Sequence, residues 1–240
     1  MSLSVDLESK TYFGQQAGIR VSGGRLRLKT ILSSVNEWVR ATVGPGFIDR
    51  AVGALVRAYT RHESTFLDLG CGSMRLRQYL LPGCTYNAID MSMSEFTLRS
   101  RVLSDPSVNF CFGLANRIPA PAESVDVCAA SEVLEHVPNV DEAFQEIRRI
   151  LRPGGYLLLS IPNNYQYKYD VVGKNPDHIN EWRFDEFSTL LGKHGFSTQI
   201  AYRRGLWIPI RHRHLQNFYL PIQPSLERRT SNFFYACQRN

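Results

Sequence analysis

The sequence predicts an α/β fold in which a doubly wound, mostly parallel sheet carries helices on both faces. Two observations support this fold class. From about residue 65, short apolar runs alternate with segments of helical periodicity, which is typical of parallel strands joined by helices. A strand, a turn with two glycines and a helix-like run also follow one another over residues 65–81, and ligands of open α/β sheets bind beside such turns.

The expected elements divide the chain into two regions. The chain of 240 residues is long enough for one α/β domain with additions. We expect an N-terminal helical extension or cap over 1–62 and a domain over 63–240, with an insertion at about 204–231 between the last two strands, far longer than a hairpin needs. The expected strands are 65–69, 85–90, 107–112, 125–131, 155–161, 196–202 and 232–237, and the expected helices are 26–42, 47–60, 74–81, 93–103, 140–151 and 184–194.

Composition and charge indicate the expected location and the expected kinds of partner. No apolar run approaches 18 residues and no signal-peptide pattern opens the chain, so we expect a cytoplasmic protein without stable membrane insertion. The five cysteines are scattered and are typical of core residues in a reducing compartment. The net charge of +6 is concentrated in the basic segments 20–29 and 203–213. These segments are either solvated surface or a sign of an anionic substrate or nucleic acid.

The turn after the first strand contains an acid and two glycines. Asp68 precedes Gly70, Cys71 and Gly72, and glycines let the backbone approach a ligand closely. A dinucleotide fingerprint needs a third glycine, but Arg75 occupies that position. A carboxylate inside the turn would repel a pyrophosphate, whereas it suits a cationic ligand group.

Asp90 ends the next strand, where a carboxylate can accept hydrogen bonds from both hydroxyls of a ribose. An acid at the glycine turn and an acid ending the second strand fit a nucleoside that carries an amino acid. This stretch resembles motif I and the following acidic strand of the class I S-adenosylmethionine-dependent methyltransferases. The resemblance extends over residues 65–161. It implies S-adenosylmethionine as cofactor and a Rossmann-like sheet of seven strands with the last one antiparallel. The cofactor-binding residues that it implies are Asp68, Gly70, Cys71, Gly72, Asp90, Met91, Leu114, Ala115 and Ser131.

One position departs from the family pattern. The family's loop after the third strand often reads Gly-Asp-Ala, with the acid binding the adenine amino group. Here Leu114 replaces the acid between Gly113 and Ala115. Either Asn116 and the backbone supply this contact or it is missing, so Leu114 and Ala115 are expected only as neighbours of the adenine.

The candidate catalytic residues follow the fourth strand of the domain. Glu132, Glu135 and His136 have i,i+3 and i,i+4 spacing, so in a helical turn they would share one face. Two carboxylates and an imidazole together suit a divalent cation. His178 lies after the fifth strand, from which it can reach the same end of the sheet.

This arrangement resembles two subsets of the family. The Glu-x-x-Glu-His run is similar to that of the ubiquinone-pathway O-methyltransferases. Together with the Asp-His-x-x-Glu-Trp-like segment 177–182, it is similar to the small-RNA 2′-O-methyltransferases. The resemblance implies that Glu132, Glu135, His136 and His178 hold a divalent metal, Mg²⁺ or similar, near the acceptor oxygen. Without a metal, His136 or His178 would serve as general base, and purely structural roles remain an alternative.

The expected function is methyl transfer from S-adenosylmethionine to a hydroxyl of a small molecule or of a glycan or lipid-linked intermediate, including anionic ones. The basic segments and the 177–182 match keep RNA 2′-O-methylation as an alternative. A catalytically inactive, cofactor-binding regulatory protein is a second alternative, because Leu114 weakens the expected adenine contact. Asn163 and Asn164, which follow the fifth strand, are candidates either for substrate contact or for turn formation.

Overall fold

The computed structural model describes residues 46–92, 105, 107–166, 169–170, 173–207, 219–220 and 227–240. All of them belong to one compact unit, Gly44–Asn240. The helices expected at 26–42 and 93–103 and the basic segment 20–29 lie outside the described residues. The second basic segment, 203–213, is described only as far as residue 207.

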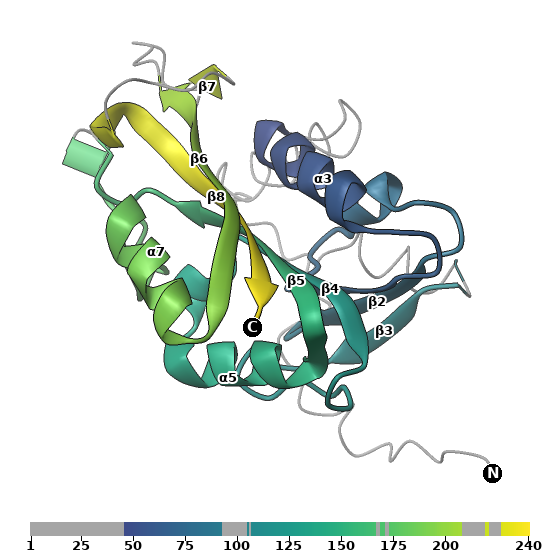
Figure 1. Cartoon of the computed structure of the whole chain (residues 1–240). Helices are drawn as coiled ribbons and strands as arrows, with labels where there is room; N and C mark the ends of the chain where they lie inside the picture. Colours follow the sequence, from purple (N-terminus) through teal and green to yellow (C-terminus); the bar gives the residue numbers. More distant parts are fainter. Residues whose placement is uncertain are drawn as a thin grey trace, which may run out of the picture. The chain divides into compact units, whose positions relative to one another are not determined.

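The described elements form an α/β unit (Figure 1). Its α-helices are α3 (Phe47–Tyr59), α5 (Val140–Ile150) and α7 (Phe184–Lys193), and its 3-10 turns are η1 (Arg75–Tyr79), η2 (Leu134–His136) and η3 (Glu227–Arg229). Its strands are β1 (Thr65–Leu69), β2 (Thr85–Asp90), β3 (Asn109–Phe112), β4 (Val125–Ser131), β5 (Leu151–Pro162), β6 (Phe196–Trp207), β7 (Tyr219–Leu220) and β8 (Thr230–Arg239). None of the helices in the described part of the chain has the length and apolar character needed to span a membrane.

The strands form one sheet in the order β3-β2-β1-β4-β5-β8-β6-β7. Strands β1 to β5 pair in parallel, whereas β8 is antiparallel to both of its neighbours, β5 and β6. This confirms the predicted fold class, including the antiparallel last strand. The two-residue β7 pairs with the end of β6 and adds an eighth strand that the sequence did not predict.

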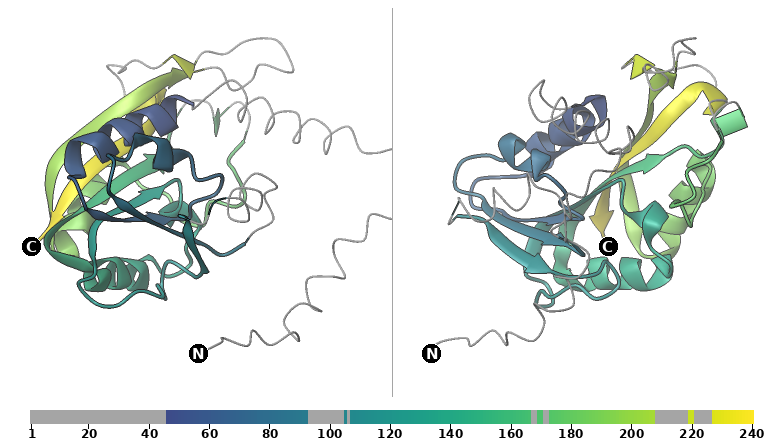
Figure 2. Two further views of the ribbon diagram at one scale, coloured as in Figure 1. Left: turned by 90° about the vertical axis from the view of Figure 1, so that its right-hand side faces the viewer. Right: turned by 180° about the vertical axis from the view of Figure 1, so that it is seen from behind.

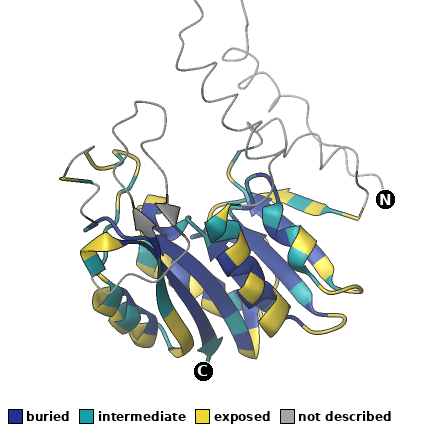
Figure 3. Ribbon diagram, turned by 90° about the horizontal axis from the view of Figure 1, so that it is seen from above, coloured by how far each residue is buried: buried dark blue, intermediate teal, exposed yellow. Residues whose placement is uncertain are grey.

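The two faces of the sheet are covered by different helices, as side and rear views show (Figure 2). Helix α3 buries Ala51, Val52 and Val56 on one face. Helices α5 and α7 bury Phe144 and Phe187 on the other. The strands between them are largely buried (Figure 3), which explains their continuous apolar runs. Helix α3, expected in the N-terminal extension, therefore packs within the unit of the sheet, and this unit begins before residue 63.

Several predicted elements differ from the structure in type or extent. Strand β5 begins at Leu151 rather than at 155, and β3 differs from its expected bounds by two residues at one end and β8 by two residues at both ends. The run 74–81 is the short 3-10 turn η1 rather than a helix, because Met74 takes a left-handed backbone conformation with φ +57° and buries its side chain completely. Strand β6 continues to Trp207, since Arg204 and Leu206 pair with β8. The insertion therefore begins after Trp207 rather than at 204.

Alanine substitutions at two helical glycines are expected to change the free energy of unfolding in opposite directions. Alanine stabilises helices by about 1 kcal/mol over glycine, but a Cβ at Gly53 of α3 would lie 2.4 Å from the Tyr79 ring. Relieving such overpacking costs about 1 to 3 kcal/mol, so Gly53→Ala is expected to lower the free energy of unfolding. At Gly192 of α7 no atom lies within 4 Å of the added Cβ, so Gly192→Ala is expected to raise it. Denaturant titration of both variants checks this, and a gain in both would contradict the packing of Tyr79 on α3.

Candidate active site

The glycine turn after β1 is fixed by its backbone. Gly70 and Gly72 have φ values of +66° and +45°, which favour glycine. The N–H groups of Gly70 and Cys71 donate to the carbonyl oxygen of Ile89 at 2.8 and 3.1 Å, so the turn is tied to β2. A Cβ at Gly70 would lie 2.5 Å from Val133, and the glycine therefore also allows the segment after β4 to pack against the turn.

The two predicted cofactor carboxylates lie in different surroundings. Asp68 is buried beneath the turn and accepts a hydrogen bond from the Tyr86 hydroxyl at 2.6 Å. Burial raises the pKa of Asp68 to about 7, while the Tyr86 hydrogen bond opposes this shift. Asp90 accepts hydrogen bonds from the N–H groups of Gly72 (3.0 Å) and Ser92 (3.1 Å), one on each oxygen. Each carboxylate oxygen of Asp90 retains acceptor capacity for a hydroxyl.

Apolar side chains surround the ends of β2 and β3. Met91 is 74% exposed, Phe112 is 59% exposed and Leu114 is 51% exposed. Exposed apolar side chains beside a carboxylate suit the face of a flat aromatic base attached to a sugar, and the cofactor-binding role predicted for Met91 stays a prediction. Ala115 is buried, and the Asn116 amide donates to Glu142 at 3.1 Å. That Leu114 and Ala115 lie beside the adenine stays a prediction.

Glu132 does not share a face with Glu135 and His136, as the helical spacing predicted. The residues after β4 do not form an α-helix, because Glu132 itself is left-handed with φ +57° and only η2 follows. Its two oxygens accept hydrogen bonds from the Ser160 hydroxyl (2.8 Å) and the Asn232 amide (2.9 Å). Burial raises the pKa of Glu132 to about 7, and these two hydrogen bonds lower it in part.

The predicted cofactor residue Ser131 belongs to the same network. Its hydroxyl lies 2.9 Å from that of Ser160, which in turn donates to Glu132. This hydrogen-bonded chain joins β4, β5 and β8 at the ends of the strands. It therefore fixes the Glu132 carboxylate against the ends of the strands.

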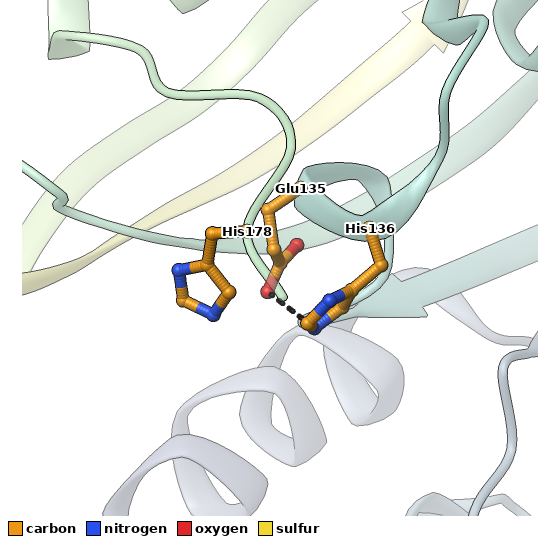
Figure 4. Close-up of side chains that lie close together, drawn as sticks. All are labelled: Glu135, His136 and His178. Atoms are coloured by element: carbon orange, nitrogen blue, oxygen red, sulfur yellow. Dashed lines mark ion pairs between the residues drawn. The ribbon is translucent and has the colours of Figure 1, made fainter. Parts of the chain in front are cut away.

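Glu135, His136 and His178 form a compact cluster (Figure 4). One ligand atom from each lies within 4.8 Å of the other two, and the two imidazole rings are 5.0 Å apart. Glu135 is fully buried and neither of its carboxylate oxygens has a hydrogen-bond partner among the described residues. Burial, followed by the nearby Glu132 carboxylate, raises the pKa of Glu135 well above its usual range.

Backbone contacts bring His178 to this cluster from a distant part of the chain. The N–H groups of Ile179 and Asn180 both donate to the carbonyl oxygen of Glu135, at 2.8 and 3.0 Å. The Asn180 amide also donates to the carbonyl oxygens of Leu134 and Val137. The segment around His178 is thereby clamped onto the η2 turn. This confirms that His178 reaches the end of β4, as predicted.

The hydrogen bonds of the two histidines set which nitrogen faces the cluster. The Nδ1 atom of His136 lies 2.8 Å from the carbonyl oxygen of Asp177, and that of His178 lies 2.9 Å from the Oδ1 atom of Asn164. Because a carbonyl oxygen only accepts, both Nδ1 atoms carry hydrogen. In the neutral rings the lone pair then resides on Nε2. For His136, Nε2 lies 3.8 Å from Glu135.

Several residues of the site were not recognised in the sequence. Asn232 is 100 positions from Glu132 and no local pattern relates them, and the same holds for Ser160 and Asn180. Asn164 carried a signal, since it follows β5, and the structure gives it the role of holding His178. Asn163 is a structural residue: it is fully buried and its amide donates to the carbonyl oxygens of Glu227 and Thr230.

Comparison with known proteins adds independent information. Residues 67–159 match a family model described as a methyltransferase domain. The chain is 32% identical over 116 residues to the ubiquinone biosynthesis O-methyltransferase of Pseudomonas syringae pv. tomato, covering 45% of this chain and 49% of that protein. It is 33% identical over 114 residues to phthiotriol/phenolphthiotriol dimycocerosates methyltransferase 1 of Mycobacterium ulcerans, covering 45% of this chain and 42% of that protein.

Solved structures share the fold. An S-adenosylmethionine-dependent methyltransferase from Methanosarcina mazei superposes with a TM-score of 0.57 at 17% identity, covering 77% of this chain and 96% of that chain. The chain spans about half or less of the length of the two curated relatives.

Proposed function

We propose that the chain is a class I S-adenosylmethionine-dependent methyltransferase and that it transfers a methyl group to a hydroxyl of a small molecule or of a glycan or lipid-linked intermediate. The observation that carries this proposal is the cluster of Glu135, His136 and His178 beside the end of β4. A hydroxyl needs a group that takes its proton, and this cluster offers two imidazoles. The O-methyltransferase named among the relatives supports the same acceptor atom.

The residues of the chain would divide the reaction between them. The bound cofactor supplies an electrophilic methyl group on a sulfonium sulfur. The Nε2 atom of His136 or His178 would take the acceptor's proton as the new O–C bond forms and the C–S bond breaks. Glu135 would stabilise the resulting imidazolium, since its carboxylate lies beside both rings. Asp177 and Asn164 would keep each ring in the tautomer that presents Nε2.

A metal-assisted variant of this reaction uses the same residues. Glu135, His136 and His178 fit a divalent cation, because a buried carboxylate without a hydrogen-bond partner and two imidazoles converge. Two imidazoles and one carboxylate favour a transition metal over Mg²⁺. Glu132 is not in our proposed ligand set, since only Glu135, His136 and His178 converge among the described residues and Ser160 and Asn232 fix the Glu132 oxygens. A cation held there would make an acceptor hydroxyl a better nucleophile.

The two alternatives predict different behaviour. RNA 2′-O-methylation is supported by the joining of the 177–182 segment to η2, and it predicts RNA binding that weakens steeply with salt. A catalytically inactive regulatory protein predicts cofactor binding without methyl transfer. The cytoplasmic location stays a prediction from the sequence.

Calorimetric titration tests the proposal in two steps. The first step titrates S-adenosylmethionine into the full chain, and absence of binding at millimolar concentration would overturn the methyltransferase assignment. The second titrates Zn²⁺, Mn²⁺ and Mg²⁺ with S-adenosylhomocysteine present. If a metal is used, we expect binding that His178→Ala and Glu135→Ala abolish and that His62→Ala, at an exposed histidine before β1, leaves unchanged. No binding by the wild type would discard the metal and leave the histidine bases.

A further inference from the structure

A pocket adjoins the Glu135, His136 and His178 cluster and takes no part in the chemistry described so far. Its volume is about 390 Å³, within the range of small-molecule sites. Asn164 lines this pocket and also holds the His178 ring through its Oδ1 atom. The residues that line it are Asn164, Tyr165, Tyr169, Asp170, Lys174, Arg183, Glu227 and Arg228.

A second residue of the pocket is affected by the charge of the candidate catalytic carboxylates. Tyr169 lines the pocket, and burial raises the pKa of its phenol to about 12, with smaller contributions from the Glu132 and Glu135 carboxylates. The phenol therefore lies within electrostatic reach of the candidate catalytic carboxylates. Asn164 remains the direct contact between the pocket lining and the cluster, through its hydrogen bond to His178.

The charges that line the pocket do not cancel. Both carboxylates face a cation: Asp170 pairs with Arg228 at 2.5 Å, and Glu227 lies 4.0 Å from Arg203, which is outside the pocket lining. Lys174 pairs with Glu181 outside the pocket lining.

Arg183 is left with a guanidinium group that forms no ion pair within the described part of the chain. Its Cζ atom lies over the Tyr165 ring, 5.0 Å from the centroid, and Lys174 Nζ lies 5.6 Å from the same centroid. Stacking on the ring orients the guanidinium but leaves its N–H donors available for a ligand. Two cations beside one ring would repel a cationic ligand, and a neutral ligand would leave the positive charge uncompensated.

We propose that this pocket binds an anionic group of the methyl acceptor, a carboxylate or a phosphate monoester, with Arg183 as its main partner. That the bound molecule is the methyl acceptor rests on the proposed function, whereas binding of an anion in the pocket does not. Planar guanidinium donors match both anions in bidentate geometry. The acceptor would then be a small acidic molecule whose hydroxyl reaches the histidines while its anion remains at Arg183.

Binding of simple probes to the full chain tests this inference without a known substrate. Benzoate and phenyl phosphate, with benzamide as the neutral analogue, would be titrated by calorimetry into the wild type, Arg183→Gln and Arg229→Gln. Arg229 is an exposed arginine next to Arg228 that does not line the pocket, so it is a matched control. We expect at least one anion to bind, about tenfold more weakly in Arg183→Gln and unchanged in Arg229→Gln, with no binding of benzamide.

The outcomes separate the two proposals. Tighter binding of benzoate supports a carboxylate acceptor, and tighter binding of phenyl phosphate supports a phosphate ester. No anion binding by the wild type, equal binding by Arg183→Gln, or equal binding of benzamide would each overturn the pocket inference while cofactor binding stands. Failure to bind S-adenosylmethionine would instead overturn the proposed function, and the anion measurements would still test the pocket by themselves.

Discussion

The Glu135→Gln variant is expected to be more stable than the wild type without ligands and about 100-fold or more slower in methyl transfer. Glu135 is fully buried and its oxygens have no hydrogen-bond partner among the described residues. Ionising a carboxyl group that is buried without a hydrogen-bond partner costs stability, and glutamine avoids this cost because it cannot ionise. Glutamine keeps the shape of the neutral carboxyl group but cannot carry the charge that the two imidazoles require.

The pH dependence of stability distinguishes this explanation from a general packing effect. Because burial raises the pKa of Glu135 above its usual value of 4.5, its contribution to stability is fully present below pH 4.5. That contribution is lost as the pH rises toward the raised pKa. The Glu135→Gln variant should therefore gain most over the wild type near pH 8 and nothing near pH 4.

Thermal unfolding at several pH values, together with methyl transfer to an acceptor that the wild type uses, checks both expectations. Glu142→Gln, at an exposed glutamate of α5, serves as control and should change neither stability nor rate appreciably. A Glu135→Gln variant that is less stable at pH 8 and equally active would show that Glu135 has a structural role.

The Asp90→Ala variant is expected to bind S-adenosylmethionine about 100-fold more weakly or worse. Two hydrogen bonds from ribose hydroxyls to a carboxylate contribute about 1.5 to 3 kcal/mol each. The variant also loses the acceptor for the Gly72 N–H, so the glycine turn would no longer be held in its conformation. Both effects act on the same ligand and both lower its affinity.

Calorimetric titration of S-adenosylmethionine measures this loss, with Asp126→Asn as the control. Asp126 is a carboxylate of similar exposure at the start of β4, where it accepts the Thr65 N–H and pairs with Arg152. Its replacement is expected to affect stability but not cofactor affinity. Unchanged affinity in Asp90→Ala would mean that the nucleoside binds elsewhere.

Local patterns were enough to predict most of the fold. Strands β1, β2 and β4 were predicted with their observed bounds, because buried parallel strands consist of continuous apolar runs with turns between them. The conformation after β1 was not predictable in the same way. The left-handed Met74 follows from burial of its side chain in the finished core, which is a tertiary effect.

The candidate site was predictable where the chemistry lies close in sequence to the strand ends. Asp90, Glu135 and His136 all follow strands whose ends meet at one edge, so their positions could be inferred from the strand pattern. The orientation of Glu132 could not, since it depends on a left-handed backbone and on Asn232 from β8. The i,i+3 and i,i+4 spacing places side chains on one face only where the segment forms a helix.

The place of β8 in the sheet has a consequence for protein synthesis. Strand β6 contacts β5 only through β8, since β8 pairs with both of them. A nascent chain whose residues 230–239 are still inside the ribosome would thus expose the edge of β5 and leave β6 and α7 without a sheet to join. Exposed strand edges invite pairing with other chains. Glu132 would also lack the hydrogen bond from Asn232 until β8 emerges.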